Sequence, residues 1–328
     1  MITSIFNDEI KRVIQSYDIG RISKAEVLKG GLINKTFYVK NIYGKEFVIQ
    51  KLHQMLKKKL MYDIDVITQH LLKRKWDCPR LLRSRQCTMF YERDDSLWRV
   101  YEYVNGISFS QKHISKSLHR NVGLLLGLLH KDLADLHYKP KHILNGFHQK
   151  NFYIQKAISI NKSRYTPQLQ NILGDTVNNL EKYFDILSEK QQIIHGDPRI
   201  ENILFTKQHA PLVFIDYDTF MIGSIYIDIG DCLRSLLSLS SRSDFKKATE
   251  RFLTGYNSAN SKTGKVSYVQ VVSCIKYVTL ELCLRFIIDS VEQSYFSWDN
   301  KKYASQEAHN EARALETWNF FNKLNQTL

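Results

Sequence analysis

The fold is decided by the stretch His195-Gly196-Asp197-Pro198-Arg199-Ile200-Glu201-Asn202-Ile203-Leu204-Phe205 and by a second stretch soon after it, Phe214-Ile215-Asp216-Tyr217-Asp218. Short apolar runs flank both polar loops, and such runs are typical of buried strands. Strands on both sides would bury the carboxylate and amide oxygens of the loops together. This burial costs free energy unless a metal ion or hydrogen-bond donors take up the oxygens. The two stretches therefore predict a buried polar site.

The spacing of the oxygen ligands in these loops is suited to phosphoryl transfer. That reaction needs an acceptor for the proton of the incoming hydroxyl and a divalent cation held by hard oxygen ligands. We expect Asp197 to be the catalytic base, Asn202 and Asp216 to bind Mg2+, and Asp218 to contact the metal or the acceptor. His195 is expected to brace the loop. The alternative is that these are ordinary turn residues, because Asp, Asn, Gly and Pro favour turns.

The front of the chain has the pattern of antiparallel strands. Residues 25–29, 36–40 and 45–52 are predicted strands, with a hairpin turn at 41–44, and further strands are expected at 87–92 and 97–104. A helix is predicted over residues 58–75. Between the first two strands, Gly30 and Gly31 would allow positive φ angles and a close approach of backbone amides to a ligand. A plain turn is the alternative.

Beyond residue 105 the apolar period becomes helical, over residues 116–137, 166–190, 245–256, 267–291 and 305–324. The sequence therefore predicts an α+β protein with two lobes. We expect a nucleotide-binding lobe over residues 1–104 and a catalytic and acceptor-binding lobe over residues 105–328, with the ligands between them.

The bulk composition restricts the partners. Lys and Arg number 47 against 33 Asp and Glu, a net charge of +14 that suits a polyanion such as a nucleotide. The basic residues are scattered, so nucleic-acid binding is not expected. Five cysteines without a Cys-x-x-Cys pair indicate reduced thiols. The most apolar stretch, residues 266–288, contains charged side chains, and the N-terminus has no signal-like pattern, so we expect a cytoplasmic protein without a membrane segment.

Together, the His-x-Asp-x-x-x-x-Asn loop, the following Ile-Asp pair, the Gly-rich hairpin and the hinge-like strand resemble the aminoglycoside phosphotransferase and choline kinase superfamily. The resemblance covers most of the chain. It implies a bilobal protein-kinase-like fold, with an antiparallel-sheet N-lobe and a mainly helical C-lobe. It also implies ATP and Mg2+ as cofactors and a small-molecule hydroxyl compound as acceptor.

The same resemblance implies the nucleotide contacts. Gly30, Gly31 and Asn34 would cover the phosphates, and the backbone of the segment Glu102, Tyr103 and Val104 would hold the adenine. Two neighbouring residues of the third strand are candidates for the position of the nucleotide-binding lysine. Gln50 aligns best by pattern, whereas Lys51 carries the charge, and alternate strand residues share a face. Its acidic partner on the following helix is open between Asp63 and Asp65.

Several segments, among them Gly31–Phe37, Phe47–Leu52 and Asp216–Gly223, are similar to the N-acetylhexosamine kinases, which phosphorylate the anomeric hydroxyl of the sugar. That similarity implies a sugar acceptor contacted by Arg285 and Tyr295. Alternatively, Arg285 pairs with Asp289 one helical turn on, and Tyr295 is a core aromatic.

Two departures from the pattern of these sugar kinases border the acceptor pocket. The kinases usually have Asn before the catalytic Asp and a Thr-Lys pair after it, where this chain has Gly196 and Pro198-Arg199. An amino alcohol or an aminoglycoside is therefore the second choice of acceptor. A catalytically silent kinase-like module and a basic nucleic-acid-binding protein are the rivals from other classes.

Overall fold

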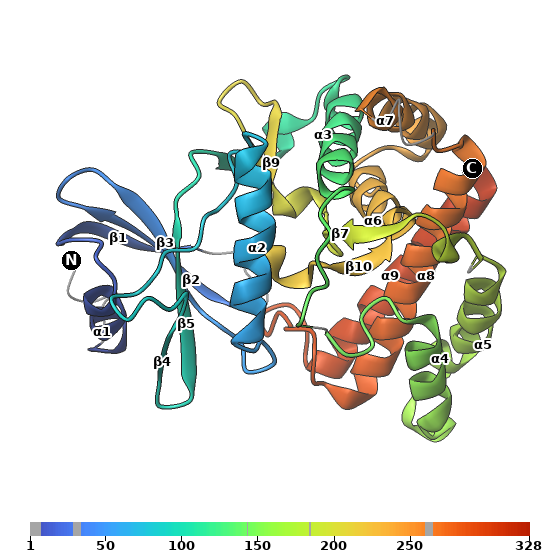
Figure 1. Ribbon diagram of the computed structural model, residues 1–328. Coiled ribbons are helices and arrows are strands. Elements are labelled where there is room, and N and C mark those ends of the chain that lie inside the picture. Colours follow the sequence, from blue (N-terminus) through green and yellow to red (C-terminus); the bar gives the residue numbers. More distant parts are fainter. Residues whose placement is uncertain (1–7, 29–33, 143, 184, 260–264) are drawn as a thin grey trace. The chain divides into compact units, whose positions relative to one another are not determined.

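The computed structural model describes residues 8–28, 34–142, 144–183, 185–259 and 265–328. The chain divides into two compact units (Figure 1). Residues 1–105 with 140–142 form the first unit, and residues 106–139 with 143–328 form the second.

The first unit is built on a five-stranded antiparallel sheet with the strand order β1-β2-β3-β5-β4. A hairpin turn joins β2 to β3, and the Asn41 side chain accepts the backbone N–H groups of Tyr43 and Lys45 there, both at 2.9 Å. Gly44 takes a φ of +81° in the same turn, which only glycine adopts without strain. The strands are β1 (Ile22–Leu28), β2 (Lys35–Asn41), β3 (Glu46–Lys51), β4 (Tyr91–Arg93) and β5 (Ser96–Glu102).

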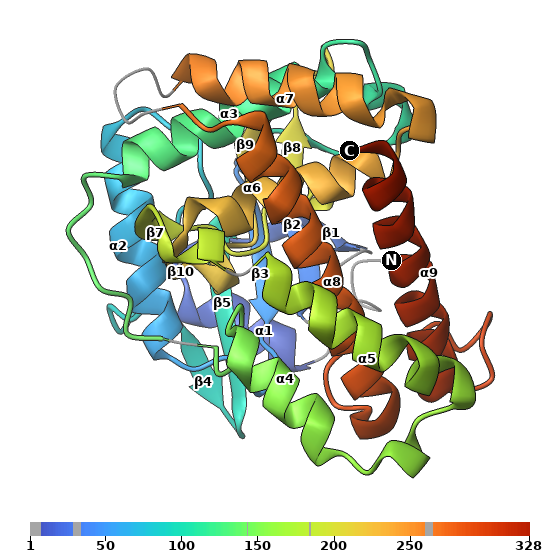
Figure 2. The ribbon, with the colours of Figure 1, turned by 90° about the vertical axis from the view of Figure 1, so that its right-hand side faces the viewer.

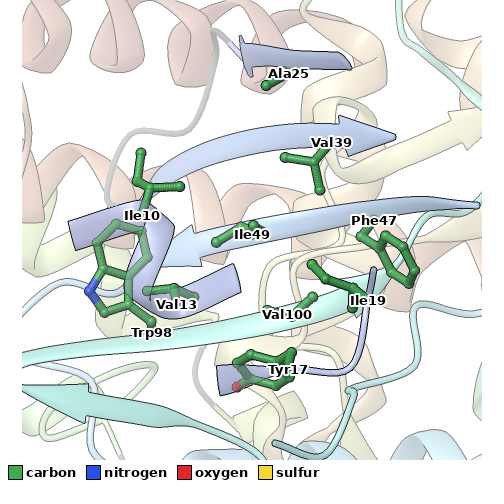
Figure 3. Packing of buried hydrophobic residues seen from close by; sticks show 10 residues of the cluster. All are labelled: Ile10, Val13, Tyr17, Ile19, Ala25, Val39, Phe47, Ile49, Trp98 and Val100. Carbon is green, nitrogen blue, oxygen red and sulfur yellow. The ribbon is translucent and has the colours of Figure 1, made fainter. Parts of the chain in front are cut away.

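Two helices accompany this sheet, α1 (Asp8–Ser16), which the sequence patterns did not predict, and α2 (Lys59–Lys73). Figure 3 shows apolar side chains of α1, such as Ile10 and Val13, packed with Ile49 and Trp98 of the sheet in one buried cluster. Because successive strand residues point to opposite faces, Phe47, Ile49 and Lys51 of β3 all point to the face that carries α1. The predicted strand over 87–92 is wrong in part, since β4 begins only at Tyr91.

The second unit is mainly helical. Its longest helix, α8, contacts α4, α5, α6 and α9 and carries mostly buried side chains, which places it at the centre of the unit (Figure 2). The sequence analysis missed α4. The helices are α3 (Leu118–Leu133), α4 (Lys150–Ser159), α5 (Pro167–Lys182), α6 (Ile225–Leu237), α7 (Phe245–Ala259), α8 (Tyr268–Glu292) and α9 (Gln306–Thr327).

Two small antiparallel sheets of the second unit hold the polar loops. One has the order β6-β8-β9 and the other pairs β10 with β7. Their strands are β6 (Ile107–Ser108), β7 (Gln191–Ile194), β8 (Ile203–Phe205), β9 (Pro211–Phe214) and β10 (Met221–Ser224). The predicted α+β class, with an antiparallel sheet in the N-terminal part of the chain and helices in the C-terminal part, is confirmed. Within the described residues, no helix combines the length and apolarity needed to cross a bilayer.

Candidate active site

The loop that carries Asp197 lies between β7 and β8. Apolar residues on both sides are fully buried, among them Ile194 before the loop and Ile203 and Phe205 after it. These strands fix the loop ends, and a short 3-10 turn at Ile200–Asn202 returns the chain to β8. The polar side chains therefore project from a rigid frame, as a precise chemical site requires.

Asp228, in the first turn of α6, holds the start of this loop. Its buried carboxylate accepts the backbone N–H of His195 and of Gly196, each at 2.8 Å. The same carboxylate lies 3.0 Å from His130 Nε2, and His130 Nδ1 lies 2.7 Å from the hydroxyl of Tyr256. Sequence reasoning missed this network. Its members come from three helices, and helical spacing gives no signal for contacts between helices.

His195 is buried and bonds backbone atoms with both ring nitrogens. Nε2 donates to the carbonyl of Ile215 at 3.1 Å, and Nδ1 accepts the backbone N–H of Asp197 at 3.3 Å. These two roles require the neutral ring with its proton on Nε2. Burial lowers the pKa of His195, which keeps the ring neutral. The geometry suits the bracing role expected for this residue.

Gly196 explains one departure from the sugar-kinase pattern. Its φ is +84°, and a Cβ atom at this position would lie 2.4 Å from the carbonyl oxygen of Thr219. The hydroxyl of Thr219 in turn donates to the carbonyl of His195 at 2.8 Å. In this loop conformation an Asn at position 196 would therefore clash with the Thr219 backbone.

The carboxylate of Asp197 is bonded by its own loop. Arg199 Nε donates to Oδ1 at 2.8 Å, and Asn202 Nδ2 donates to Oδ2 at 3.2 Å and to the Asp197 carbonyl at 2.8 Å. The side chain of Asp197 remains 27% exposed, so a substrate hydroxyl can reach it. Burial raises the pKa of Asp197, whereas the charge of Arg199 works in the opposite direction. A raised pKa makes the carboxylate a better base.

The segments of Asn202 and Asp216 lie side by side, since the backbone N–H of Ile215 donates to the carbonyl of Asn202 at 2.8 Å. Asp216 adopts a left-handed conformation, with φ 65° and ψ 65°. This conformation is uncommon for a residue other than Gly and clusters at functional sites. Asp216 lies two residues after the end of β9, directly before the 3-10 turn Tyr217–Thr219. The next turn carries Asp218, which is only 8% exposed.

The donor chemistry of these two segments fits Mg2+. The NH2 group of the Asn202 side chain donates to Asp197. The amide oxygen of Asn202 therefore points away from Asp197 and is the atom that would bind a metal ion. An amide oxygen and a carboxylate are hard ligands, and Mg2+ usually takes few protein ligands with phosphate oxygens and water completing the shell. Among the described residues no group of three or more His, Cys, Asp or Glu could hold a metal ion.

Arg285, on α8, is surrounded by aromatic rings. The centre of its guanidinium lies 5.0 to 5.6 Å from the ring centroids of Phe147, Tyr153, Tyr295 and Phe296. We call these five residues the arginine cage. Burial alone would lower the pKa of Arg285, but the neighbouring Tyr hydroxyls and the carboxylates of Glu281 and Asp197 raise it. Arg285 and Asp197 are thus close enough to interact electrostatically.

The alternative pairing of Arg285 with Asp289 is wrong. The Asp289 carboxylate accepts the backbone N–H groups of Ser294, Tyr295 and Phe296 at 2.8 to 3.0 Å. It shapes the loop after α8 and thereby holds Tyr295 beside the guanidinium. Tyr295 is also not a core aromatic, because it is 36% exposed.

In the first unit, Gln50 and Lys51 point to opposite faces of the sheet. Lys51 Nζ pairs with Glu9 of α1 at 2.7 Å. Gln50 accepts from Arg99 Nε at 2.8 Å and donates to Thr36 Oγ1 at 3.1 Å. The charge of Lys51 is therefore engaged on the face that carries α1.

The two carboxylates of α2 that were candidates for this partner bond other groups. The buried side chain of Asp63 accepts the backbone N–H of Lys141 at 2.9 Å and of His142 at 2.6 Å. Asp65 pairs with Arg83 at 3.4 Å. Asp63 therefore ties residues 140–142 to the first unit.

The remaining nucleotide predictions fall on two segments. Gly30 and Gly31 lie outside the described residues, and Asn34 accepts the backbone N–H of His53 at 3.0 Å. In the hinge segment the N–H groups of Glu102 and Tyr103 donate to the carbonyls of Arg80 and Glu46, at 2.9 and 3.1 Å. Val104, which follows them, is 7% exposed.

Similar structures are known for most of this chain. The amicoumacin kinase hAmiN in complex with AMP-PNP, Ca2+ and Ami is 13% identical, covers 100% of this chain and 99% of its own, and gives a TM-score of 0.70. APH(2")-IIia in its GDP and kanamycin complex is 14% identical, and the match covers 95% of this chain and 98% of that chain with a TM-score of 0.68. A microcompartment-associated aminopropanol kinase is 13% identical, with 96% and 94% covered and a TM-score of 0.67. At these identities the likeness shows the fold, and it confirms the predicted protein-kinase-like architecture.

A sequence comparison gives the family. Residues 24–264 match the family described as the phosphotransferase enzyme family, APH, which is more than half of the chain. The predicted enzyme class, an ATP-dependent phosphotransferase with an alcohol group as acceptor, is confirmed. With Asp197, Asn202 and Asp216 on adjoining loops inside the matched region, the chain belongs to the phosphotransferase enzyme family.

Proposed function

We propose that this protein transfers the γ-phosphoryl group of ATP to a sugar hydroxyl, in the first place the anomeric hydroxyl of an N-acetylhexosamine. Residues 1–104 would bind the nucleotide and residues 105–328 the acceptor. The observation that carries the choice of acceptor is the arginine cage, because it combines hydrogen-bond donors with aromatic walls close to the proposed base.

The chemistry of the cage suits a neutral sugar. A guanidinium offers N–H donors in a fixed plane and has no acceptor, so it matches hydroxyl and carbonyl oxygens such as that of an acetamido group. Aromatic rings such as Tyr295 and Phe296 offer apolar faces to the C–H surface of a sugar. A cationic acceptor would instead be repelled by the positive charge of Arg285, because charges in a partly buried site are weakly screened by solvent.

In the proposed reaction, Asp197 accepts the proton of the acceptor hydroxyl. The hydroxyl oxygen forms a bond to the γ-phosphorus, the bond from that phosphorus to the bridging oxygen breaks, and ADP leaves with the electron pair. Asn202 and Asp216 would hold Mg2+, which neutralises charge on the phosphates when bound. Arg199 and Asn202 keep the carboxylate oriented before the hydroxyl arrives, so the entropy of alignment is lost before the reaction.

For the nucleotide we propose Gln50, with Gly30, Gly31 and Asn34, near the phosphates, and Lys51 in support of the fold. Thr36 belongs to the strand that follows the glycines, and its bond to Gln50 links that segment to Gln50. Because the N–H groups of Glu102 and Tyr103 are used within the unit, the adenine would bond the N–H of Val104 or a carbonyl of this segment.

The test is nucleotide consumption by the purified protein with ATP and Mg2+ against N-acetylhexosamines, other sugars, amino alcohols and aminoglycosides. Turnover limited to N-acetylhexosamines, lost in Asp197→Asn but kept in the exposed loop variant Glu201→Gln, supports the proposal. Turnover of aminoglycosides or amino alcohols in preference to sugars contradicts the acceptor choice. Nucleotide binding without any turnover would favour the silent module.

The role of the cage has its own measurement. Arg285→Met keeps much of the side-chain volume and removes the donors, so the KM for the sugar should rise on the order of tenfold or more, with the KM for ATP unchanged. Lys156→Met is a matched control, because Lys156 also lies over an aromatic ring, 5.7 Å from the centroid of Phe152, but outside the cage. An unchanged sugar KM in Arg285→Met would remove the cage from the acceptor site.

A further inference from the structure

A histidine that sequence analysis did not select lies against the loop of the proposed base. His148 comes between α3 and α4, has a φ of +53°, and exposes only 7% of its side chain. Its Nε2 lies 2.7 Å from the carbonyl oxygen of Gly196. Its Nδ1 lies 3.0 and 3.2 Å from the two carboxylate oxygens of Glu281 on α8, whose side chain is 2% exposed.

The two partners of this ring determine its protonation. A carbonyl oxygen and an ionised carboxylate only accept hydrogen bonds, and a neutral imidazole has one N–H to donate. Both contacts are therefore satisfied only by the imidazolium, with a proton on each nitrogen. Burial by itself lowers the pKa of His148, but the charge of Glu281 and the bond to Gly196 offset that effect and raise the pKa above its ordinary value.

The bond to Gly196 acts on the peptide group directly before the base. Asp228 accepts the N–H of Gly196, and His148 donates to its carbonyl, so this glycine is held from two sides. Glycine has the widest conformational freedom of any residue, and the direction of its peptide needs such restraint. The Gly196 carbonyl belongs to the peptide that carries the N–H of Asp197, so its direction also sets the direction of the Asp197 side chain.

We propose that His148, as an imidazolium paired with Glu281, is a positioning residue that holds the Gly196 carbonyl and so aims Asp197 at the acceptor hydroxyl. The inference depends on the proposed function for the role of Asp197. If the ring lost one proton, the remaining proton would stay on Nδ1 beside the carboxylate, and the Nε2 lone pair would face the Gly196 carbonyl. The rate should then fall at high pH.

Other charged and titratable groups face this pair. Arg285, one turn along α8 from Glu281, opposes the positive charge of His148. Asp231 of α6 is stabilised as the anion by His148, in addition to Arg234 and Arg199. Burial raises the pKa of Tyr277 and of Tyr153, and the charge of nearby Glu281 adds to that effect. These groups titrate outside the neutral range, so a change near neutral pH belongs to His148.

Two variants separate the charge from the hydrogen bond. In Glu281→Gln the amide can donate to Nδ1, which leaves a neutral ring with its proton on Nε2 and preserves the bond to Gly196. The kcat should then lose its decline at high pH. His148→Phe removes the bond at every pH, and kcat should fall on the order of tenfold with the KM for ATP unchanged. His119→Gln is the control, because it removes a partly buried histidine that is bonded to Ser240 at 3.2 Å.

The experiment pairs ring NMR with kinetics. The nitrogen-15 chemical shifts of the His148 ring are followed in the free protein from pH 5 to 9. Over the same range the kcat of ATP hydrolysis, with water as the phosphoryl acceptor, and the thermal unfolding of each variant are measured. We expect the ring to be doubly protonated at neutral pH in the native protein and neutral in Glu281→Gln, with the high-pH decline of kcat present in the native protein and absent in Glu281→Gln.

The possible results have distinct meanings. A neutral ring at pH 7 in the native protein overturns the inference. So does a folded His148→Phe variant with native kcat at all pH values. If ATP hydrolysis is insensitive to Asp197→Asn, the proposed function fails instead, and the NMR result still shows whether the imidazolium exists.

Discussion

Arg199 Nε donates a hydrogen bond to Asp197 Oδ1 at 2.8 Å, across only two residues of the same loop. A permanently charged guanidinium therefore lies in direct contact with the carboxylate of the proposed base. Since Arg199 favours the ionised form, it lowers the pKa of Asp197 against the effect of burial.

The first prediction concerns this pair. In Arg199→Gln the pKa of Asp197 should rise, so the base becomes protonated at a higher pH. The acid limb of the kcat profile should therefore shift to higher pH. The rate above that limb should persist, because Asn202 still orients the carboxylate. The check is a kcat profile from pH 4.5 to 8, with the exposed Arg242→Gln as control. An acid limb at its native position would mean that Arg199 does not set the protonation of Asp197.

A second prediction compares two glycines. Gly196→Ala should lower the free energy of unfolding by on the order of 1–3 kcal/mol because of the left-handed φ, and more because its Cβ would lie 2.4 Å from Thr219 O. Gly174, in α5, has no atom within 4 Å of an added Cβ, so Gly174→Ala should stabilise by about 0.5–1 kcal/mol. Urea unfolding measures both. Equal effects at the two sites would contradict the strained loop.

A third prediction separates the neighbours on β3. Lys51→Met breaks the pair with Glu9, in which both side chains are about one-third exposed, so stability should fall by about 1 kcal/mol or less. Its affinity for ATP should stay native. Gln50→Ala should weaken ATP binding. Calorimetric titration with ATP and Mg2+ tests both, and the reverse pattern would assign the nucleotide contact to Lys51.

The metal ligands give a fourth prediction. Asp216→Asn should raise the Mg2+ concentration needed for half-maximal rate, because a neutral amide holds a divalent ion less tightly than a carboxylate. Binding of Mn2+ in the presence of ADP, followed by electron paramagnetic resonance, should weaken in parallel. Asp244→Asn, an exposed site, should leave both measurements native. Native Mn2+ binding in Asp216→Asn would exclude Asp216 as a ligand.

The sequence by itself determined the features that are local along the chain. Apolar periodicity predicted most of the helices and most of the strands, because each period reports one face of one element, although it missed α1 and α4. The loop around Asp197 and Asn202 was recognisable because its polar residues lie within a few positions of one another between apolar strands. The family followed from the order of these motifs.

Only the tertiary structure decided the contacts between distant segments. His148 and Glu281 are separated by 133 residues in the sequence, and the aromatic rings of the arginine cage come from two segments, residues 147–153 and residues 295–296, that are equally distant along the chain. No local pattern marks such pairs, because the free energy that joins them comes from packing α8 into the unit. The sequence predicted that the neighbours Gln50 and Lys51 point to opposite faces of the sheet, but only the structure showed that Lys51 lies on the face that carries α1.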